Sequence, residues 1–497
     1  MVNFQDLKNE GFKFHAENNL EKAEKCYIRA LEIDSKNAEI FNLLGIINLQ
    51  KGNINKALEW IKKAINIEKN AYFYETLFQA YIKIQDFQSI VSMEKNVEKL
   101  FPQEFSLIFN IALANKNLKN IKDSIYYYKK SIEINPNSYD AWFNLSHLYE
   151  IEGETYKAVD ALSICKRLKP NDKDTEYFYS IALLRIKDYD NGLKFFESRL
   201  CKDIAIASQN KTYPNKAVND NLWHGEDISN KTIFVYYEAG LGDVIMFARY
   251  LPLLKQRCKK IILKVHEPLV NLFLENNQLG VDEVIDKFIP EQDIHFDVHV
   301  PMLSLPYALG LKGEAVFTGH SGYLKQNEIK KAEYKEKFFN TNKIKIGIKW
   351  QGNTYYDMDR VIPTEEFFPL IDEMSNAQFY SFQTFEGSEE VKKLTDRYNV
   401  IDIGKDLRDF TMTSAALSNL DLVICNDTSL AHLAGALNIP CWIMLPYEVN
   451  WRWHTDLSIC DWYDSVKLFR QKYIGNWTSI FKEALEVLKN NDFRINK

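Results

Sequence analysis

Residues 421–437 read DLVICNDTSLAHLAGAL, and this stretch decides how the second half of the chain is organised. The apolar run Leu422–Cys425 predicts a buried strand, which a short polar turn connects to a helix beginning near Thr428. Asp427, Thr428 and Ser429 are residue types that favour the N-cap of a helix. A helix that begins at the carboxyl end of a strand presents free backbone N–H groups and the positive end of its dipole. This arrangement favours phosphate binding.

His432 follows Thr428 by four positions, so both side chains lie on one face near the start of this helix. The pair therefore adds a hydroxyl and an imidazole to the predicted phosphate site. The same stretch also fits an ordinary capped helix that carries one internally bonded histidine.

The sequence around this stretch alternates between strand and helix patterns. After Lys231, TIFVYYE predicts a strand, EAGLGD a turn, VIMFARYLPLLKQRC a helix and KKIILKVH a second strand. From Lys343 the pattern starts again with KIKIGIKW, the helix PTEEFFPLIDEM and the strand AQFYSFQ. This alternation predicts parallel sheets. We expect two Rossmann-like lobes, residues 232–342 and 343–497, with a cleft between them.

Ligands of such sheets bind outside the carboxyl ends of the strands, which directs attention to three further loops. In the first, Gly240 and Gly242 allow a ligand to approach the backbone, and Asp243 is a candidate general base or, alternatively, a helix cap. The other two loops supply candidate donors to a nucleotide, namely Lys349, Arg360 and Gln383. The cluster Trp451–Trp453 is interpreted as packing, although its rings also suit stacking on a base or sugar.

The first two hundred residues repeat with a period near 34. Small residues recur at Ala23, Ala57 and Ala158, and bulky residues recur four positions after each of them. Pro136 and Pro170 each follow a predicted helix. These features are typical of tetratricopeptide helix pairs, which stack into a solenoid with a concave binding face. We expect a repeat domain at 1–200, with a degenerate third repeat, and a linker at 201–231.

Composition narrows the classes of function. The net charge of −6 gives no basic footprint, so nucleic acid is not an expected partner. The seven cysteines contain no CxxC pair, and no apolar run approaches the ~20 residues of a membrane-spanning helix. We expect a cytoplasmic protein without a transmembrane segment. His295 and His299 lie in a strand-like stretch, so their spacing does not predict a metal site, and we expect neither a metal nor a cofactor.

Six ordered motifs together resemble one family. They are EAGLGDVIMFARYLPLL, FDVHVPMLSLPYALG, IGIKWQGN with DRVIP, DLVICNDTSLAHLAGAL, NWRW and WYDSVKLFRQ. Across residues 220–480 they resemble glycosyltransferase family 9, the ADP-heptose–lipopolysaccharide heptosyltransferases, in the form that carries tetratricopeptide repeats in front. The resemblance implies the GT-B fold, no essential metal and inversion at the anomeric carbon.

The resemblance also implies roles for particular residues. Asp243 corresponds to the base that deprotonates the acceptor, Arg360 to a cation of the nucleotide site, and a further motif to the diphosphate site (Asp427, Thr428, His432, Leu433, Ala434 and Ala436). Three positions depart from the family pattern: Ser429 where glycine is frequent, Val361 where serine is frequent, and Asp464 or its neighbour where a proline is expected. The sugar pocket is not constrained by these motifs.

The sequence therefore predicts a metal-independent, inverting glycosyltransferase that uses a nucleotide-sugar donor. The acceptor is a saccharide, a lipid-linked group or a protein, and the repeats recruit it or bind a protein partner. Two alternatives stay open: a non-catalytic tetratricopeptide scaffold with a degenerate α/β half, and a protein O-glycosyltransferase.

Overall fold

The computed structural model describes residues 3–201, 221–290, 293–320, 322–353, 358–454 and 460–490. Contacts divide the chain into two compact units, Met1–Asn171 and Asp172–Lys497. The predicted linker 201–231 lies largely outside the described residues, and strand β1 already begins at Ile228.

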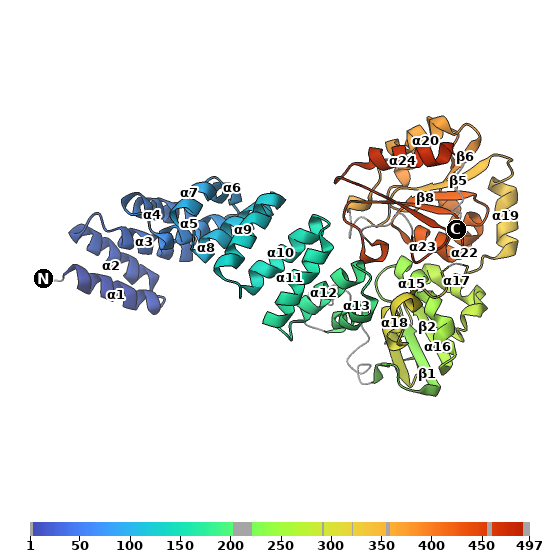
Figure 1. The fold of residues 1–497 in the computed structure, drawn as a ribbon, viewed down its shortest axis with the longest axis horizontal. Coiled ribbons are helices and arrows are strands. Elements are labelled where there is room, and N and C mark those ends of the chain that lie inside the picture. The colour runs from blue at the N-terminus through green and yellow to red at the C-terminus, as the bar shows by residue number, and fades with distance from the viewer. Residues whose placement is uncertain are drawn as a thin grey trace. The chain divides into compact units, whose positions relative to one another are not determined.

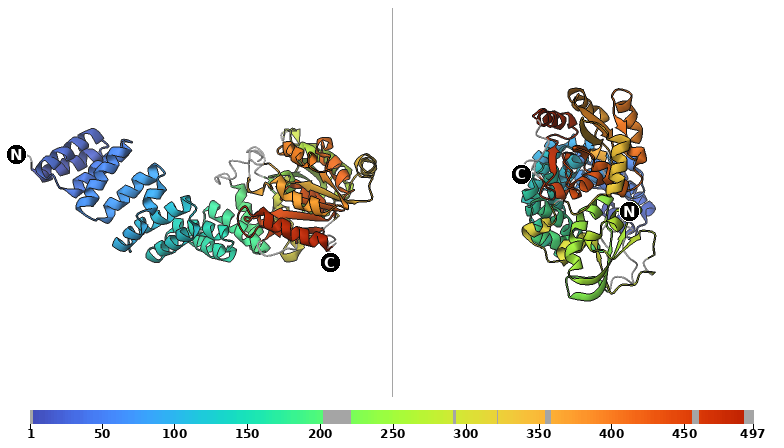
Figure 2. Two further views of the ribbon diagram at one scale, coloured as in Figure 1. Left: turned by 90° about the horizontal axis from the view of Figure 1, so that it is seen from above. Right: turned by 90° about the vertical axis from the view of Figure 1, so that its right-hand side faces the viewer.

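The first unit is a series of helix pairs in which each pair stacks on the next (Figures 1 and 2). The helices are α1 Phe4–Ala16, α2 Leu20–Ile33, α3 Ala38–Gln50, α4 Ile54–Ile67, α5 Ala71–Lys83, α6 Phe87–Val91, α7 Glu94–Leu100, α8 Phe105–Asn117, α9 Ile121–Ile134, α10 Tyr139–Ile151 and α11 Thr155–Leu168. In the third pair the second helix is divided into α6 and α7, in the repeat whose sequence departs most from the pattern. The helical repeats expected from the 34-residue period are confirmed.

Small and bulky residues explain this period. A Cβ atom at Gly11 would lie 2.4 Å from Cε1 of Tyr27, and one at Gly45 would lie 2.4 Å from Cγ1 of Ile61. In these two pairs a bulky side chain of the second helix therefore occupies the space that a glycine leaves on the first. Such close packing tolerates little added volume.

The second unit begins with one more helix pair, α12 Lys173–Arg185 and α13 Tyr189–Phe196, followed by the short helix η1 Glu197–Leu200. Two parallel sheets follow. The first has the order β3-β2-β1-β4 (Glu283–Asp286, Cys258–Val265, Ile228–Tyr236, Val298–Pro301). The second has the order β10-β9-β8-β5-β6-β7 (Val466–Arg470, Cys441–Leu445, Leu422–Asn426, Ile344–Lys349, Ala377–Ser381, Ile401–Asp402). The predicted parallel sheets are therefore confirmed.

Each sheet forms one lobe together with the helices that connect its strands (Figure 1). The first lobe is the four-stranded sheet with α15 Leu241–Phe247, α16 Leu251–Lys255, α17 Val270–Glu275 and α18 Leu305–Ala308. The second lobe is the six-stranded sheet with α20 Phe368–Glu373, α21 Val391–Thr395, α22 Phe410–Leu417, α23 Ser429–Ala436 and α24 Trp477–Lys489. Helix α19 Glu328–Phe338 packs against α22.

Strand β8 shows how both faces of the second sheet are buried. Val423 and Cys425 belong to the core shared with α23 and the first lobe, whereas Leu422 and Ile424 belong to the core formed with α20 and α24. Because successive side chains of a strand point to opposite faces, a strand buried on both faces reads as a continuous apolar run.

One predicted element is wrong in detail. VIMFARYLPLLKQRC was expected to form one helix, but the structure divides it into α15, the 3₁₀ turn η3 Ala248–Tyr250 and α16. Pro252 lies in the first turn of α16, and proline cannot donate the backbone hydrogen bond that a continuous helix requires. Likewise, PTEEFFPLIDEM begins with a 3₁₀ turn, η10 Thr364–Phe367, before α20.

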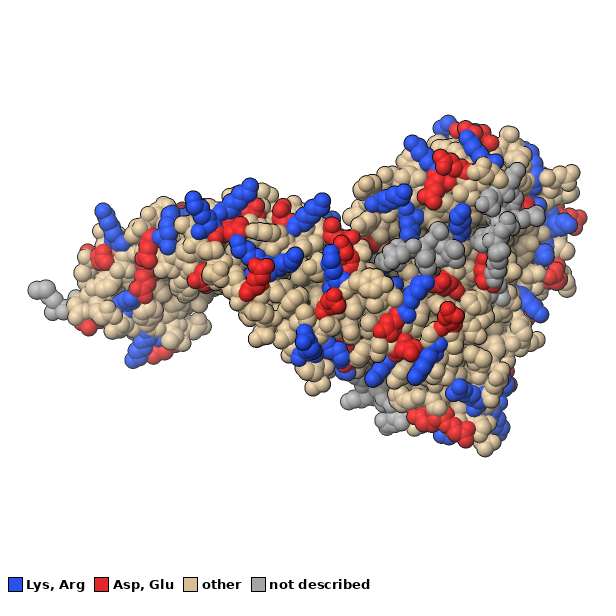
Figure 3. Space-filling model, in the orientation of Figure 1, with Lys and Arg blue, Asp and Glu red and all other residues tan. Residues whose placement is uncertain are grey.

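Charged side chains of both signs are interspersed over the described residues on the face shown in Figure 3. This mixture agrees with the small net charge of −6. Within the described residues, no helix has the length and apolarity needed to cross a membrane.

Candidate functional site

The candidate site forms where the first helix of one lobe meets a helix of the other. Helix α15 follows β1 in the first lobe, α23 follows β8 in the second, and the two helices pack together near their N-termini. A Cβ atom at Gly242 would lie 2.7 Å from Cδ2 of His432 and 3.3 Å from Cα of Ser429. Glycine at this position lets the two backbones approach. The structure therefore brings Gly242 against Ser429 and His432, and Gly240 and Asp243 lie in the same N-terminal turn of α15.

Thr428 is the N-cap residue of α23, with extended backbone angles of φ −141° and ψ 173°. Its hydroxyl makes no capping hydrogen bond, and within the described part of the chain its buried Oγ1 has no hydrogen-bond partner. The first amides of a helix also lack acceptors within the helix. This helix start therefore combines free donors with an uncommitted hydroxyl.

Arg360 lies beside this helix start at the end of the 3₁₀ turn η9 Met358–Arg360. Its Nη1 is 3.1 Å from Oδ2 of the buried Asp427, and its carbonyl accepts a 2.9 Å hydrogen bond from Nδ2 of Asn426. These contacts tie the loop after β5 to the end of β8. A Cβ atom at Gly352, in the same loop, would lie 3.0 Å from Cγ2 of Thr428.

His432 is buried on the face of α23 that meets α15. Its Nδ1 is 2.9 Å from the Tyr463 hydroxyl, and its ring stacks on Trp453 with centroids 5.1 Å apart. Burial first, and then the positive charges of Arg452, Arg249 and Arg360, hold the pKa of His432 well below its usual range. The imidazole is therefore neutral near pH 7 and carries one N–H donor.

Asp243 lies in the first turn of α15. Its Oδ2 accepts a 2.9 Å hydrogen bond from the amide of Gly240, and its Oδ1 forms an ion pair with Nη2 of Arg452. Arg452 belongs to the 3₁₀ turn η13 Trp451–Trp453 of the second lobe. The ion pair thus joins the two lobes directly.

Sequence reasoning missed this role of Arg452. It considered Trp451–Trp453 as a group of rings for packing or stacking, and it assigned no partner to the arginine between them. The signal available was an arginine flanked by two large apolar residues, because a buried guanidinium requires a partner.

Lys349 and Gln383 are buried beneath the carboxyl edge of the second sheet. Nζ of Lys349 is 3.5 Å from the carbonyl of Phe382, and burial lowers the pKa of Lys349 to about 8. Gln383 uses its side-chain oxygen to accept from the amides of Trp350 (3.2 Å) and Gln351 (3.1 Å). Its side-chain nitrogen donates to the carbonyls of Gln351 (3.0 Å) and Glu386 (2.6 Å).

Gln383 therefore clamps the loops after β5 and β6 to each other. The contact of Gln383 and Lys349 with a nucleotide stays a prediction.

Side chains of α12 and of η1 surround the loop that follows β1 in the first lobe. Buried Arg199 of η1 donates from Nη2 (2.8 Å) and Nε (3.3 Å) to the carboxylate of buried Glu238, which opens this loop. Arg199 also donates to Ser304 (2.7 Å) and pairs with Glu197 (2.8 Å). Tyr177 of α12 lies within electrostatic reach of Asp243 and Arg452. Sequence reasoning did not anticipate these contacts.

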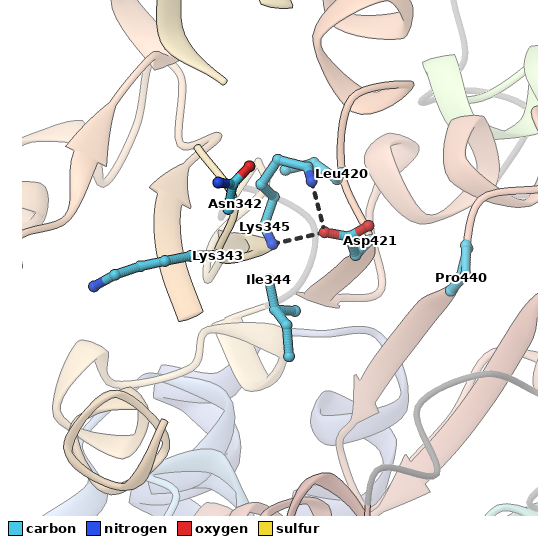
Figure 4. Close-up of a pocket in the computed structure, with 7 residues that line it drawn as sticks. All are labelled: Asn342, Lys343, Ile344, Lys345, Leu420, Asp421 and Pro440. Carbon is cyan, nitrogen blue, oxygen red and sulfur yellow. Dashed lines mark hydrogen bonds and ion pairs between the residues drawn. The ribbon is translucent and has the colours of Figure 1, made fainter. Parts of the chain in front are cut away.

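A separate surface pocket lies at the opposite edge of the second sheet (Figure 4). It is lined by residues at the amino ends of β5, β8 and β9, and there Nζ of Lys345 is 3.0 Å from Oδ2 of Asp421. Because parallel sheets bind ligands at their carboxyl ends, we assign the functional site to the α15–α23 contact. Among the described residues, no group of three or more His, Cys, Asp or Glu is arranged to hold a metal ion.

Comparison with known proteins identifies the helical repeats. A family model described as TPR repeat matches residues 11–52, and models described as Tetratricopeptide repeat match residues 38–70, 105–138 and 127–160. Protein FlbA of Caulobacter vibrioides is 22% identical over 400 residues, which are 75% of this chain and 65% of FlbA. Human Protein O-mannosyl-transferase TMTC3 is 27% identical over 191 residues, which are 37% of this chain and 20% of TMTC3.

The chain spans less than two thirds of the length of these relatives. Among solved structures, pilF of Pseudomonas aeruginosa is 16% identical with a TM-score of 0.36, covering 41% of this chain and 95% of its own. A tetratricopeptide repeat protein from Parabacteroides merdae is 16% identical with a TM-score of 0.34, covering 40% and 78%. The family models, and not these structures, show that the N-terminal part of the chain carries TPR repeats.

Proposed function

We propose that this protein is a metal-independent, inverting glycosyltransferase of GT-B architecture that uses a nucleotide-sugar donor. In this proposal the repeats recruit or position the acceptor. The observation that supports the proposal is the contact of α15 with α23, in which Gly242, the chain neighbour of Asp243, meets Ser429 and His432 at the start of the other lobe's helix.

The second lobe has the chemistry that a departing diphosphate requires. Negative charge develops on the diphosphate as its bond to the anomeric carbon breaks, and preorganised donors stabilise that charge. The start of α23, the free hydroxyl of Thr428 and the neutral imidazole of His432 are such donors, and Arg360 adds a cation. A neutral imidazole donates one hydrogen bond without bringing a titrating charge to the site.

The first lobe has the group that the acceptor requires. The acceptor oxygen attacks the anomeric carbon, the bond from that carbon to the diphosphate oxygen breaks with its electron pair, and the acceptor proton passes to the Asp243 carboxylate. A positioned general base of this kind contributes about 10²- to 10⁴-fold in rate. Attack from the face opposite the leaving group inverts the anomeric carbon.

Two relatives bear on the proposal. The alignment with FlbA spans 75% of the chain and therefore extends beyond the repeats. TMTC3 is named an O-mannosyl-transferase, but its alignment spans 37% of this chain, so the proposal does not depend on it.

The test begins with titration calorimetry of the full-length protein against UDP-, ADP- and GDP-sugars. We expect saturable binding of one donor class and transfer to an acceptor. Asp243→Asn should lower the rate of transfer by about 10²- to 10⁴-fold while donor binding is retained. The matched control is Asp396→Asn, which changes an exposed aspartate after α21 and should leave transfer unchanged.

Two outcomes would contradict the proposal. Unchanged transfer by Asp243→Asn would remove Asp243 from the role of base. The absence of saturable binding by every donor would favour a scaffold in which the α/β half is degenerate. A glycan found on a co-expressed protein would instead identify a protein as the acceptor.

A further inference from the structure

Arg452 is a buried cation whose hydrogen-bonding capacity is incompletely used. Its exposed fraction is 7%, its Nη2 pairs with Asp243, and its Nη1 donates to Oδ1 of Asn450 over 2.7 Å. Its guanidinium lies 4.7 Å from the centroid of the Trp451 ring. Within the described residues, its buried Nε has no hydrogen-bond partner. A buried donor without an acceptor is destabilising, so this guanidinium has reason to engage another group.

Arg452 acts on both halves of the candidate site. On one side it pairs with the carboxylate of Asp243, the candidate base. On the other side, its charge is the largest cause, after burial, of the lowered pKa of His432 on α23. Trp453, the next residue in the chain, stacks on His432 with ring centroids 5.1 Å apart, so the turn that carries Arg452 contacts both the proposed base and the helix of the proposed diphosphate site.

The carboxylate of Asp243 has both oxygens engaged. Oδ1 pairs with Arg452, and Oδ2 accepts from the amide of Gly240 over 2.9 Å. The Gly240 contact belongs to the N-terminal turn of α15 and fixes the carboxylate in place. An ionised carboxylate keeps further lone pairs beside these two contacts, but the guanidinium occupies one side of Oδ1. Of the two contacts, the one with Arg452 is the one that can be exchanged.

Arg360 differs from Arg452 because its carboxylate partner belongs to its own lobe. Arg360 pairs with Asp427 over 3.1 Å, and His432 is neutral. A diphosphate that enters this region brings negative charge and several acceptor oxygens, which a guanidinium binds with charge-assisted hydrogen bonds. Such a ligand competes directly with Asp243 for Arg452.

We propose that Arg452 is shared between the two partners. It is held by Asp243 in the arrangement of the structure, and it moves onto the diphosphate of the donor when the donor binds. Binding of the donor then clears the guanidinium from Oδ1 of Asp243, the oxygen that the acceptor hydroxyl approaches. This inference rests on the proposed function and deepens it, because it makes donor binding the step that activates the base.

The test is a double-mutant cycle on nucleoside diphosphate affinity, measured by calorimetry with the full-length protein. The probe is whichever of ADP, GDP and UDP binds the wild type. Asp243→Asn removes the competitor for Arg452, so we expect it to tighten binding by about 5- to 10-fold. Arg452→Met should weaken binding, and the tightening by Asp243→Asn should disappear in the Arg452→Met background.

Several controls keep the cycle interpretable. Arg452→Lys keeps a cation at this position and should retain part of the coupling, which guards against misfolding of Arg452→Met. Asp421→Asn removes a carboxylate from the Lys345 pair at the opposite edge of the second sheet and should leave affinity unchanged.

The outcomes separate this inference from the proposed function. If Asp243→Asn leaves affinity unchanged, or if its tightening persists with Arg452→Met, sharing of Arg452 is overturned while the glycosyltransferase proposal stands. Persistent tightening would instead show simple repulsion between Asp243 and the diphosphate. If none of the three probes binds the wild type, both proposals fail.

Discussion

At the scale of single residues, Lys349 is a buried cation that opposes folding. Burial lowers its pKa from an ordinary value of 10.5 to about 8. Between about pH 8 and pH 10.5 the unfolded chain holds a proton at this lysine that the folded protein has lost. Lys349 therefore lowers the free energy of unfolding most below pH 8. This loss shrinks as the pH rises through the window.

Lys349→Met should accordingly raise the free energy of unfolding near pH 7 by about 2–3 kcal/mol. The gain should shrink as the pH approaches 10.5, because the wild type then loses its penalty. Urea denaturation at a series of pH values measures both effects. The exposed Lys405→Met serves as the control and should show no such trend. A gain that does not vary with pH would contradict the burial argument.

Arg199 has the opposite effect, since it compensates a buried carboxylate. Arg199→Met leaves Glu238 buried without its guanidinium, and removal of one partner from such a pair costs about 3–5 kcal/mol. Lys260→Met breaks the exposed pair with Glu283, where both side chains are at least 40% exposed, and should cost about 1 kcal/mol or less. Tryptophan fluorescence suits the measurement, because all tryptophans except Trp60 and Trp142 lie in the second unit. Equal losses for the two variants would argue against a buried pair.

Single-residue chemistry was readable from the sequence only where the partner is local. Asp243, Thr428 and His432 follow strands, so their positions at the carboxyl edges were predicted from the strand patterns. The partner of Asp243 was not predicted, because Arg452 lies 209 positions away in the chain. The pair of Arg199 with Glu238, which lie 39 positions apart, was not predicted either. Neither separation corresponds to a helical or strand period, so no local pattern relates these residues.

At the scale of elements, the approach of α15 to α23 depends on Gly242. A methyl group there would lie 2.7 Å from Cδ2 of the buried His432, a side chain stacked on Trp453 and bonded to Tyr463. Gly242→Ala should force the helices apart and cost about 1–3 kcal/mol, as overpacking does elsewhere. It should also weaken nucleoside diphosphate binding.

Gly240→Ala is the matched comparison, because the nearest atom to its Cβ would be Oδ2 of Asp243 at 3.5 Å, an ordinary contact. We expect its melting temperature to stay close to that of the wild type, while that of Gly242→Ala falls. If both variants melt alike, the helices are not held together at Gly242.

The elements were predicted well where the hydrophobic period is unbroken. The strand expected at Leu422–Cys425 runs to Asn426, and the helix expected near Thr428 begins at Ser429. The helix expected across VIMFARYLPLLKQRC failed because its apolar period continues through Pro252, whose missing backbone donor interrupts the structure. Pro252 is visible in the sequence, but the prediction of one helix relied on the apolar period instead.

At the scale of the whole molecule, the sequence predicts a domain boundary near residue 200, whereas contacts divide the chain between Asn171 and Asp172. The last helix pair therefore belongs to the second unit by its contacts. Arg185 donates to the carbonyl of Val449 over 3.0 Å, and the Tyr189 hydroxyl is 2.9 Å from Nε2 of His454. The 34-residue period identified α12 and α13 as a repeat, but a period does not specify what a repeat packs against. The domain boundaries stay a prediction.

This difference leads to a test by truncation. A chain that begins at Asp172 keeps α12, α13 and Arg199, and it should fold with the cooperative transition of the second unit. A chain that begins after Cys201 loses all three and leaves Glu238 buried without compensation, so it should be insoluble or melt far lower. Tryptophan fluorescence and circular dichroism during heating measure both chains.

Adding Glu238→Gln to the shorter chain separates two causes of instability. If the uncompensated charge of Glu238 is the main cause, the substitution should recover part of the lost stability. If the lost packing of α12 and α13 is the main cause, it should recover little.

The truncated chain that begins at Asp172 also tests the proposed activity. The chain from Asp172 should bind the donor as the full chain does, because the α15–α23 site is intact, but it should turn over acceptor poorly if residues 1–171 position the acceptor. Full turnover by this chain would mean that the first five helix pairs have another role.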